Sequence, residues 1–529
     1  MSSLDDIGWD VIVIGAGLGG GICARALAEA GLRVLIVERG PQTPRTAENA
    51  MECEHADPFA RGLFGCWPTP VEARVDSAVT SGWGGQGVGV GGSSVFYAAS
   101  LERPERHDLE SVADCPHPTG GWPVGHDEFA PWFARAEALM ELNGTPDPLS
   151  DADAVLRDPP PLATRDAALG EALMAAGLHP YRTHLAIRFQ PGCQECIGHK
   201  CPRDCKRDGR SAGVEPALAT GRAALMTDAV VTALHGAGRR IESITIRRPN
   251  GETRALRARI FVLAAGGLAS PGLLLASACE AWPQGCANAS GLVGRGLMFH
   301  LNERIALWPP RRAARGPAAD VGPQKAFSLR DFYRDGSDRM GLLQALGLPA
   351  SYGNIVHVLN QHYDRSALRR LRPGRELMRL PALAAALVLG EARIYAGILE
   401  DLPYDENRVL YDPDRPDTLI YEYRLAEELL ERRRRFRQRI KRGLGGVRSM
   451  FLGVGPELNV AHPCGTLRFS DNPRRGVLNR DGRAHEIDNL YGADSAFMPT
   501  STGVNPGLTI VANALRVADL IVASAGARQ

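Results

Sequence analysis

The N-terminal end of the chain carries the feature that most restricts its fold, an apolar run that leads into closely spaced glycines. Residues 11–14 are continuously apolar and β-branched, as is typical of a buried parallel strand. Gly15, Gly17 and Gly20 follow in a G-x-G-x-x-G pattern. The first glycine permits a tight turn, the second lets the backbone approach a pyrophosphate, and the third lets a helix pack on the strand. The pattern therefore predicts the opening strand, turn and helix of a nucleotide-binding sheet.

A second apolar run, at residues 34–37, ends in an acidic residue, Glu38. Glu38 lies about 20 residues beyond the glycines, where a carboxylate would bind a ribose hydroxyl. The same negative charge would repel a 2′-phosphate. We therefore predict a dinucleotide that lacks this phosphate, and these residues alone do not separate FAD from NAD.

Length and composition exclude several classes of protein. With 529 residues the chain is too long for one compact core, so two domains are expected. The 61 basic and 60 acidic side chains give a net charge of +1, which provides no field that favours nucleic acid. The first residues show neither a basic region nor an apolar stretch, and the 11 cysteines are an odd number. We therefore expect a cytoplasmic protein without a full disulfide framework.

The middle of the chain contains a glycine-rich loop, a group of strand-like runs and an arginine-rich helix. Residues 81–94 form a glycine-rich loop that would allow close approach of a ligand. Strand-like runs occupy residues 229–234, 241–247 and 260–265, with polar turns between them. Residues 425–443 predict a helix rich in arginine, which we interpret as a solvated helical face.

Residues 365–390 join a cluster of arginines to an apolar run at residues 380–389. Such a segment could rest on an anionic membrane surface, pack as a buried helix, or act as a lid beside a substrate entrance. The apolar part is too short to span a bilayer. Because most apolar helices in soluble chains pack against the protein, we favour a buried helix or a lid over peripheral membrane contact. We predict that Leu383 and Leu387 border the substrate entrance.

Two C-terminal segments carry the most specific signal. His462-Pro-Cys-Gly is followed by a block at residues 489–510, which contains Asp494 and ends in Asn505-Pro-Gly-Leu-Thr-Ile. Together with the N-terminal glycines and the segments 91–94, 263–271 and 294–300, these blocks resemble the glucose–methanol–choline (GMC) family of FAD-dependent oxidoreductases. The resemblance covers nearly the whole chain. The chain departs from the family pattern at two places. Cys464 lies inside the histidine segment, and Val95-Phe-Tyr stands where the family often has an asparagine.

The resemblance implies an α/β fold, in which a Rossmann-like FAD-binding domain is assembled from both chain ends beside an α+β substrate domain. This is the GMC oxidoreductase fold. We assign residues 1–50, 210–300 and 456–529 to the FAD-binding domain. Residues 51–209 and 301–455 are assigned to the substrate-binding domain and cap segments.

The resemblance also implies a reaction, the FAD-dependent oxidation of an alcohol or sugar hydroxyl to the carbonyl. His462 would act as the general base and Asn505 would hold the alcohol oxygen, with hydride transfer to flavin N5. The electron acceptor would be oxygen, a quinone or a redox protein. An alternative keeps the fold and has a non-oxidative activity, either lyase-like or photochemical.

The same motifs assign the cofactor site. No histidine lies in or beside the 81–94 loop, so we expect the FAD to be bound non-covalently. The residues assigned to FAD are Gly15, Gly17, Leu18, Gly20, Glu38, Arg39, Gly91, Gly92, Ser93, Ser94, Val230, Ala265, Gly266, Asp494, Ser495, Asn505 and Pro506.

Four cysteines lie close together in the sequence, at Cys193, Cys196, Cys201 and Cys205. Thiolates at short spacing suit an iron–sulfur cluster or zinc, and they also suit a local disulfide. The spacing alone does not decide among iron–sulfur, zinc, a disulfide and free thiols.

Overall fold

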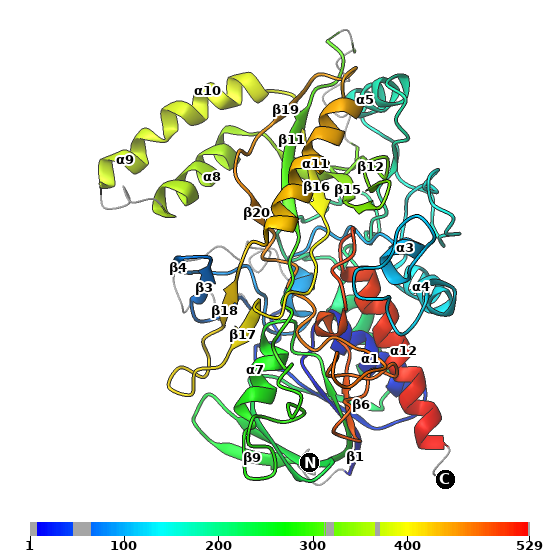
Figure 1. Cartoon of the computed structure of the whole chain (residues 1–529), viewed down its shortest axis with the longest axis vertical. Coiled ribbons are helices and arrows are strands. Elements are labelled where there is room, and N and C mark those ends of the chain that lie inside the picture. Colours follow the sequence, from blue (N-terminus) through cyan, green and yellow to red (C-terminus); the bar gives the residue numbers. More distant parts are fainter. Residues whose placement is uncertain (1–7, 46–64, 312, 314–321, 366–370, 527–529) are drawn as a thin grey trace.

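The nucleotide-binding half of the molecule is built on a five-stranded sheet, in the lower part of Figure 1. The computed structural model describes residues 8–45, 65–311, 313, 322–365 and 371–526. The strands lie in the order β21 (Leu490–Gly492), β10 (Ala258–Leu263), β1 (Trp9–Ile14), β2 (Val34–Val37) and β6 (Ala223–Met226), and all neighbours are parallel. A strand from the C-terminal end thus completes a sheet begun at the N-terminus, which confirms the predicted fold class. The exact domain limits stay a prediction.

Close backbone contact locks the two chain ends together. Helix α1 (Leu18–Glu29) begins directly after the glycine turn and packs against helix α12 (Gly507–Gly526). A Cβ atom placed on Gly19 would lie 1.9 Å from the carbonyl oxygen of Ala493, so only glycine allows this approach. Gly15 has a φ of +106°, a left-handed conformation that side chains other than glycine rarely adopt. These positions explain why the glycine pattern is so dense.

Helix α12 is long and apolar enough to cross a membrane by length and composition, and 67% of that stretch is buried within the protein. Its buried residues include Leu508, Val511, Leu515 and Ile521, which belong to the core around β1 and α1. We therefore regard α12 as a core helix, because the surface that a bilayer would cover is already packed.

The second half of the molecule is built on an antiparallel sheet. Its order is β19 (Ser449–Phe451), β11 (Leu301–Leu307), β16 (Arg393–Leu399), β15 (Gly341–Pro349), β12 (Phe327–Leu329) and β5 (Tyr181–Arg182), and β20 (Glu457–Leu458) also pairs with β11. Helices α5 (Thr164–Ala175) and α11 (Glu427–Gly443) bury Leu173, Phe436 and Ile440 in the same apolar cluster as Tyr395 of β16. This mixed part is the α+β substrate side that the resemblance implied.

Helix α11 corrects one expectation. Its arginines were predicted to be solvated, yet Arg432 and Arg433 are buried. The Arg432 guanidinium donates to the backbone carbonyls of Arg339 and Glu400, and Arg433 pairs with the buried Glu303 of β11. The long arginine stems reach past the apolar face of the helix and join it to the sheet, which composition alone does not reveal.

Smaller elements connect the two halves. A four-stranded sheet contains β17 (Arg408–Leu410), β18 (Ile420–Tyr423), β3 (Val71–Val75) and β4 (Ala78–Gly82), and a three-stranded sheet contains β7 (Val230–Ala237), β8 (Arg240–Arg247) and β9 (Thr253–Leu256). A hairpin pairs β13 (Arg334–Asp335) with β14 (Asp338–Arg339). The remaining helical segments are η2 (Gly92–Val95), α3 (Arg106–Leu109), α4 (His126–Met140), η3 (Gly209–Val214), α6 (Glu215–Ala219), α7 (Ala269–Ala276) and η5 (Ser495–Phe497).

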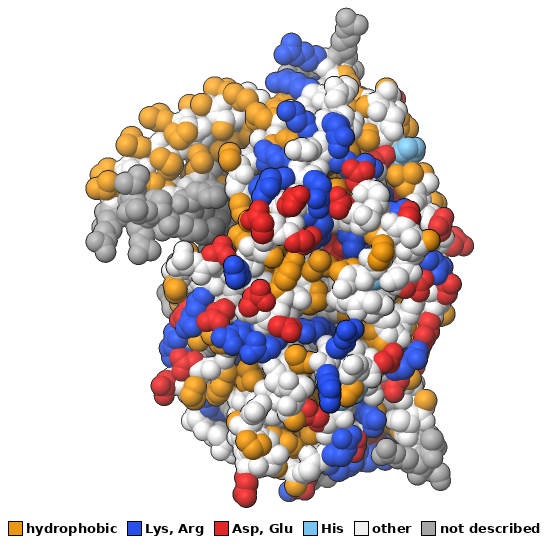
Figure 2. Space-filling model, viewed as in Figure 1, with side chains coloured by type: hydrophobic (Ala, Val, Ile, Leu, Met, Phe, Trp, Pro, Cys, Tyr) orange, Lys and Arg blue, Asp and Glu red, His pale blue; other side chains and the backbone are white. Residues whose placement is uncertain are grey.

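Three helices project from the substrate side, at the upper left of Figure 1: α8 (Tyr352–Arg365), α9 (Arg372–Leu377) and α10 (Arg379–Leu389). Hydrophobic side chains gather over this projection in Figure 2, and Leu383 and Leu387 are 53% and 78% exposed. The interpretation of this segment as a buried helix is therefore wrong. Only Ala382 and Leu389 of α10 are buried, and Leu389, at the end of the helix, joins the apolar cluster of Ala306, Ala392 and Ile394 on the body of the protein.

Candidate functional site

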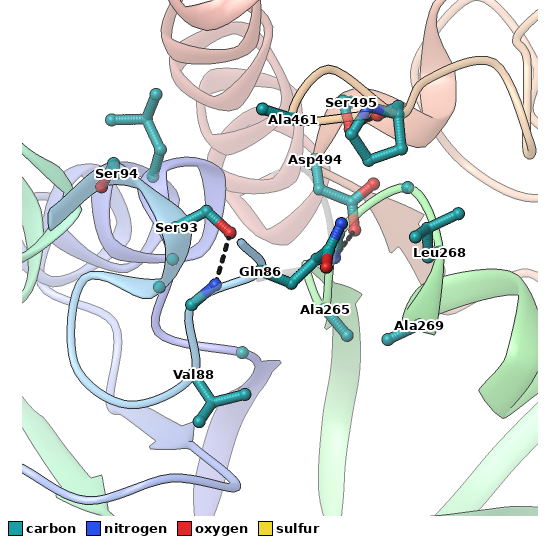
Figure 3. A pocket seen from close by; sticks show the side chains of 18 of the residues that line it. Gln86, Val88, Ser93, Ser94, Ala265, Leu268, Ala269, Ala461, Asp494 and Ser495 are labelled. Carbon is teal, nitrogen blue, oxygen red and sulfur yellow. Dashed lines mark hydrogen bonds between the residues drawn. The ribbon is translucent and has the colours of Figure 1, made fainter. Parts of the chain in front are cut away.

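A cavity of about 640 Å³ lies between the parallel sheet and the antiparallel sheet. Its walls come from the ends of β1 and β2, from the 85–101 loop region, and from the inward side chains of β11, β15 and β16. Figure 3 shows Ser93, Ala265 and Asp494, from three distant segments of the chain, around one space. None of the described residues of α8, α9 and α10 lines this cavity, so the predicted position of Leu383 and Leu387 at the entrance is not supported.

Most of the site residues predicted from the sequence meet in this cavity. Those that line it are Gly15, Gly17, Leu18, Glu38, Arg39, Gly92, Ser93, Ser94, Val230, Ala265, Gly266, His462, Asp494, Ser495, Asn505 and Pro506. Gly20 and Gly91 lie behind the wall. A Cβ on Gly20 would lie 2.0 Å from the carbonyl oxygen of Gly15, and the Gly91 N–H donates to the carbonyl of Ala16 over 2.8 Å. These two glycines shape the turn without facing the cavity.

Glu38 marks one end of the cavity. Its carboxylate accepts backbone N–H bonds from Ala16, Gly40 and Gly89, at 2.8, 2.9 and 2.9 Å. Burial raises the pKa of Glu38, and the three N–H donors act in the opposite direction. The carboxylate thus holds the glycine turn, the end of β2 and the 85–91 loop together beside the space where a ribose would bind.

Next to Glu38, the Arg39 guanidinium lies over the ring of Trp67, 4.0 Å from its centroid. Arg39 and Arg247 both donate to the carboxylate of Asp417, at 3.1 and 2.7 Å. Trp67, Asp417 and Arg247 were not identified from the sequence, because they come from three separate loops and strands. Their flat and polar surfaces form the wall of the cavity beyond Glu38.

Asp494 organises the middle of the cavity. Its carboxylate accepts the N–H groups of Ala496 and Gly266, at 2.9 and 2.8 Å, and a short hydrogen bond from the Ser270 hydroxyl. Burial raises the pKa of Asp494, while these donors lower it. The residue therefore ties the C-terminal block to the loop after β10, at the wall seen in Figure 3.

His462 lies at the opposite end, against a second histidine. Its Nδ1 atom is 3.2 Å from Nδ1 of His300 and 3.1 Å from Nδ2 of Asn459. His300 is fully buried, and its Nε2 is 3.0 Å from the carbonyl oxygen of Thr502. Burial lowers the pKa of His300 to about 4, and burial together with His300 and Lys325 lowers that of His462 well below its usual value. Both rings are therefore neutral at physiological pH.

The hydrogen bonds fix the tautomers of this histidine pair. Because a carbonyl only accepts, Nε2 of His300 carries its proton and Nδ1 of His300 is bare. Two bare ring nitrogens 3.2 Å apart would repel, so the contact with His300 favours a proton on Nδ1 of His462, whereas the Asn459 amide donor, 3.1 Å from the same atom, opposes it. We assign the proton to Nδ1, where it makes the contact between the two histidines a hydrogen bond. Nε2 of His462 is then a bare nitrogen on a ring that lines the cavity, without a hydrogen-bond partner in the described part of the chain. The histidine pair thus presents a neutral base to the cavity.

Asn505 is held by a reciprocal amide pair. Its Nδ2 donates to Oε1 of Gln344 and its Oδ1 accepts from Nε2 of Gln344, both at 3.1 Å. The Ser100 hydroxyl also donates to Oε1 of Gln344, at 2.7 Å. One Asn505 N–H is used in this pair and the other is left for a ligand. Sequence reasoning missed Gln344 and the orienting role of His300, since both act through contacts between distant segments.

The described residues show no metal centre at the four-cysteine segment. Cys193, Cys196, Cys201 and Cys205 are free thiols, and they associate as two pairs, Cys193 with Cys205 and Cys196 with Cys201. Among the described residues, no group of three or more His, Cys, Asp or Glu side chains is placed to hold a metal. The iron–sulfur and zinc interpretations are therefore unsupported, and within the described part of the chain the thiols contact one another in pairs. Ile197 and Gly198 of this segment line the cavity.

The cavity fits FAD on its own features. Gly17 stands at the N-terminus of α1 with nothing within 4 Å of where a Cβ would lie, so the helix end is open to a pyrophosphate. Glu38 follows β2 of the parallel sheet, whereas Asn505 is bonded to Gln344 of β15 in the antiparallel sheet, and His462 lines the same space. An elongated dinucleotide with a reactive ring at one end matches this order of groups.

Comparison with known proteins identifies the class. The chain belongs to the GMC oxidoreductase family: models of its N-terminal and C-terminal parts match residues 62–302 and 401–514. An FAD binding domain model matches residues 10–51. The protein is thus an FAD-dependent oxidoreductase, as the sequence motifs predicted.

Named relatives cover the chain almost completely. It is 29% identical to a 6'''-hydroxyparomomycin C oxidase of Streptomyces lividus, over 97% of this chain and 91% of that protein. It is 27% identical to a 2-methyl-1,2-propanediol dehydrogenase of Mycolicibacterium austroafricanum, over 97% of this chain and 95% of the relative. The crystal structure of a pyridoxine 4-oxidase from Mesorbium loti superposes with a TM-score of 0.64 at 18% identity, covering 97% and 99% of the two chains. This last likeness concerns the fold.

Proposed function

We propose that this protein oxidises a CH–OH group of an alcohol or sugar to the carbonyl, with His462 as the general base. The observation that carries the proposal is the bare Nε2 of His462 on the cavity wall, held in that tautomer by His300. Relatives named as an oxidase and as a dehydrogenase of hydroxyl compounds support the reaction type.

The chemistry assigns a separate task to each group. Nε2 of His462 takes the hydroxyl proton, since a neutral imidazole both accepts it and is not already charged. The free N–H of Asn505 donates to the same oxygen as negative charge develops on it, and Gln344 keeps the amide from rotating away. FAD, when bound, supplies the hydride acceptor at flavin N5. The low dielectric of the buried site strengthens both contacts.

The test begins with the purified protein, which is expected to be yellow and to release FAD on acid treatment. Anaerobic mixing with a panel of alcohols and sugars should bleach the flavin absorbance, and oxygen, a quinone or a redox protein should then restore it. Two results would overturn the proposal: retention of NAD in place of FAD, or an oxidised flavin that no alcohol or sugar in the panel reduces. The second result would favour a non-oxidative activity.

A further inference from the structure

Lys325 is a buried cation that the proposed reaction does not use. It precedes β12, is only 3% exposed, and lines the same cavity as His462. Its stem lies against β15, where a Cβ on Gly347 would be 2.8 Å from Lys325 Cγ. Within the described part of the chain its Nζ makes no hydrogen bond or ion pair. An ammonium has three donors, and a buried polar group without a partner is rare in folded proteins.

A second buried lysine shows how this protein treats a structural ammonium. Lys206 is 0% exposed, and its Nζ donates to the carbonyls of Tyr97, Cys196 and His199, at 3.1, 2.7 and 2.7 Å. All three of its donors are satisfied by backbone. Burial lowers the pKa of each lysine to about 8, so the two groups differ in partners and not in burial. The unused donors of Lys325 face the cavity, where a ligand can accept them.

The nearby acids do not neutralise Lys325. Glu102 is engaged by the His184 ring at 3.0 Å and by the Ser328 hydroxyl at 3.1 Å. Glu195 accepts the Gln324 N–H at 2.8 Å, and burial raises its pKa to about 7. Neither acid forms an ion pair with Lys325, which is protonated at neutral pH with a pKa of about 8. Its positive charge reaches His462, whose pKa it helps to lower.

The wall around His462 is otherwise uncharged. Asn302, Gln344, Asn459 and Asn505 supply neutral polar groups there. The described acids that line the cavity already have partners: Glu38 and Asp494 accept backbone N–H groups, and Asp417 accepts from Arg39 and Arg247. Among the described residues around His462, Lys325 is therefore the one charged side chain without an ion-pair partner.

We propose that Lys325 binds a carboxylate of the substrate, so that the substrate is a hydroxy acid or an acidic sugar. This inference rests on the proposed function and specifies its substrate class. The carboxylate accepts hydrogen bonds from Nζ of Lys325 while the carbinol group lies between His462 and Asn505. Substrates that carry an ammonium group at this position are repelled by the same charge.

The experiment measures binding to the FAD-loaded protein from the change in flavin absorbance and, independently, by calorimetry. The ligands are two matched sets, glycolate with glycolamide and 2-aminoethanol, and D-glucuronate with D-glucuronamide and 6-amino-6-deoxy-D-glucose. In the wild-type protein at pH 7 the carboxylates should bind at least about tenfold more tightly than the amides, and the amines most weakly. Replacing Lys325→Met should weaken carboxylate binding about 30-fold and change amide binding less than about threefold.

Lys200 provides the matched control. Its pKa is also lowered to about 8 by burial, but its Nζ donates to the Thr43 hydroxyl at 3.0 Å and it does not line the cavity. Lys200→Met should keep the carboxylate preference. A measurement on the unaltered protein is also decisive: the preference for carboxylate over amide should decline as the pH rises above about 8, where free Lys325 loses its proton.

The inference is overturned if the wild-type protein binds carboxylates no better than amides, or if Lys325→Met weakens both ligands equally. Failure of the proposed function looks different. In that case no alcohol bleaches the flavin, while carboxylate binding still depends on Lys325. If alcohols bleach the flavin and charge has no effect on binding, the reaction stands and the substrate class is wrong.

Discussion

Removing the acceptor that fixes the His462 tautomer should slow substrate oxidation while the base itself is intact. In a His300→Leu variant, Nδ1 of His462 loses the atom to which it donates. The amide of Asn459 is then the remaining partner of Nδ1 of His462. Because Nδ2 of Asn459 is a hydrogen-bond donor, this contact favours the tautomer in which Nδ1 of His462 carries no proton. The proton moves to Nε2 of His462, and the nitrogen that faces the cavity can no longer accept one.

The magnitude follows from one neutral hydrogen bond. The Asn459 donor acts on Nδ1 in both proteins, so the substitution removes only the bond to His300, which is worth about 1 kcal/mol. At about 1.4 kcal/mol for each factor of ten, the population of the reactive tautomer falls about fivefold. Anaerobic stopped-flow absorbance should show flavin reduction slowed by this factor, with FAD content unchanged.

A second substitution isolates the cause. Asn459→Ala removes the competing donor, also worth about 1 kcal/mol, so the double variant with His300→Leu should recover about fivefold in flavin reduction over the single His300→Leu variant. Thermal unfolding of each variant serves as the control, because the Thr502 carbonyl loses its donor in both. Wild-type rates in His300→Leu, or a double variant as slow as the single one, would refute the tautomer argument.

Other expected outcomes concern the same site and the glycine turn. His462→Ala should slow flavin reduction by roughly two to four decades in stopped-flow measurements and keep FAD bound. Asn505→Ala should slow the same step by roughly two decades, the usual effect of losing an oxyanion donor. Because the pKa of His300 is lowered to about 4, only the unfolded chain takes up its proton below about pH 6.5. The contribution of the neutral His300 to the free energy of unfolding is therefore complete above about pH 6.5 and decreases by about 1.4 kcal/mol per pH unit as the pH falls towards 4. In urea titrations, the unfolding midpoint of the wild-type protein should fall more steeply over this pH range than that of His300→Leu. Gly19→Ala places a Cβ 1.9 Å from a backbone oxygen, and it should destabilise the fold by about 3 kcal/mol and release FAD, whereas Gly353→Ala, in open space, should do neither.

Local patterns predicted the parts of the fold that depend on a few adjacent residues. The glycine turn, the strands on either side of it and Glu38 were found because each has a short-range signature. His462 and Asn505 were found through the resemblance of the C-terminal block. Their positions in one cavity agree with this assignment, although their catalytic roles still await the experiments above.

What escaped prediction depends on long-range pairing. His300 meets a histidine 162 residues away, and Gln344 meets an asparagine 161 residues away. Neither partner has a sequence pattern of its own. Arg432 and Arg433 escaped for a related reason, since an arginine-rich helix looks solvated until the carbonyls and the acid that receive its guanidinium groups are known.

The pairing of β21 with β10 has a consequence for how the protein is made. The glycine turn at residues 15–20 is synthesised long before β21 and the Ala493 backbone that meet it in the folded domain. Until then the sheet has an open edge, and α1 lacks its neighbour α12. The complete cofactor site can therefore form only after residues 489–505 have been synthesised. A chain that stops before residue 489 lacks β21, Asp494 and Asn505 together, and such a product is expected to be degraded as an incomplete domain instead of persisting as a weakened enzyme.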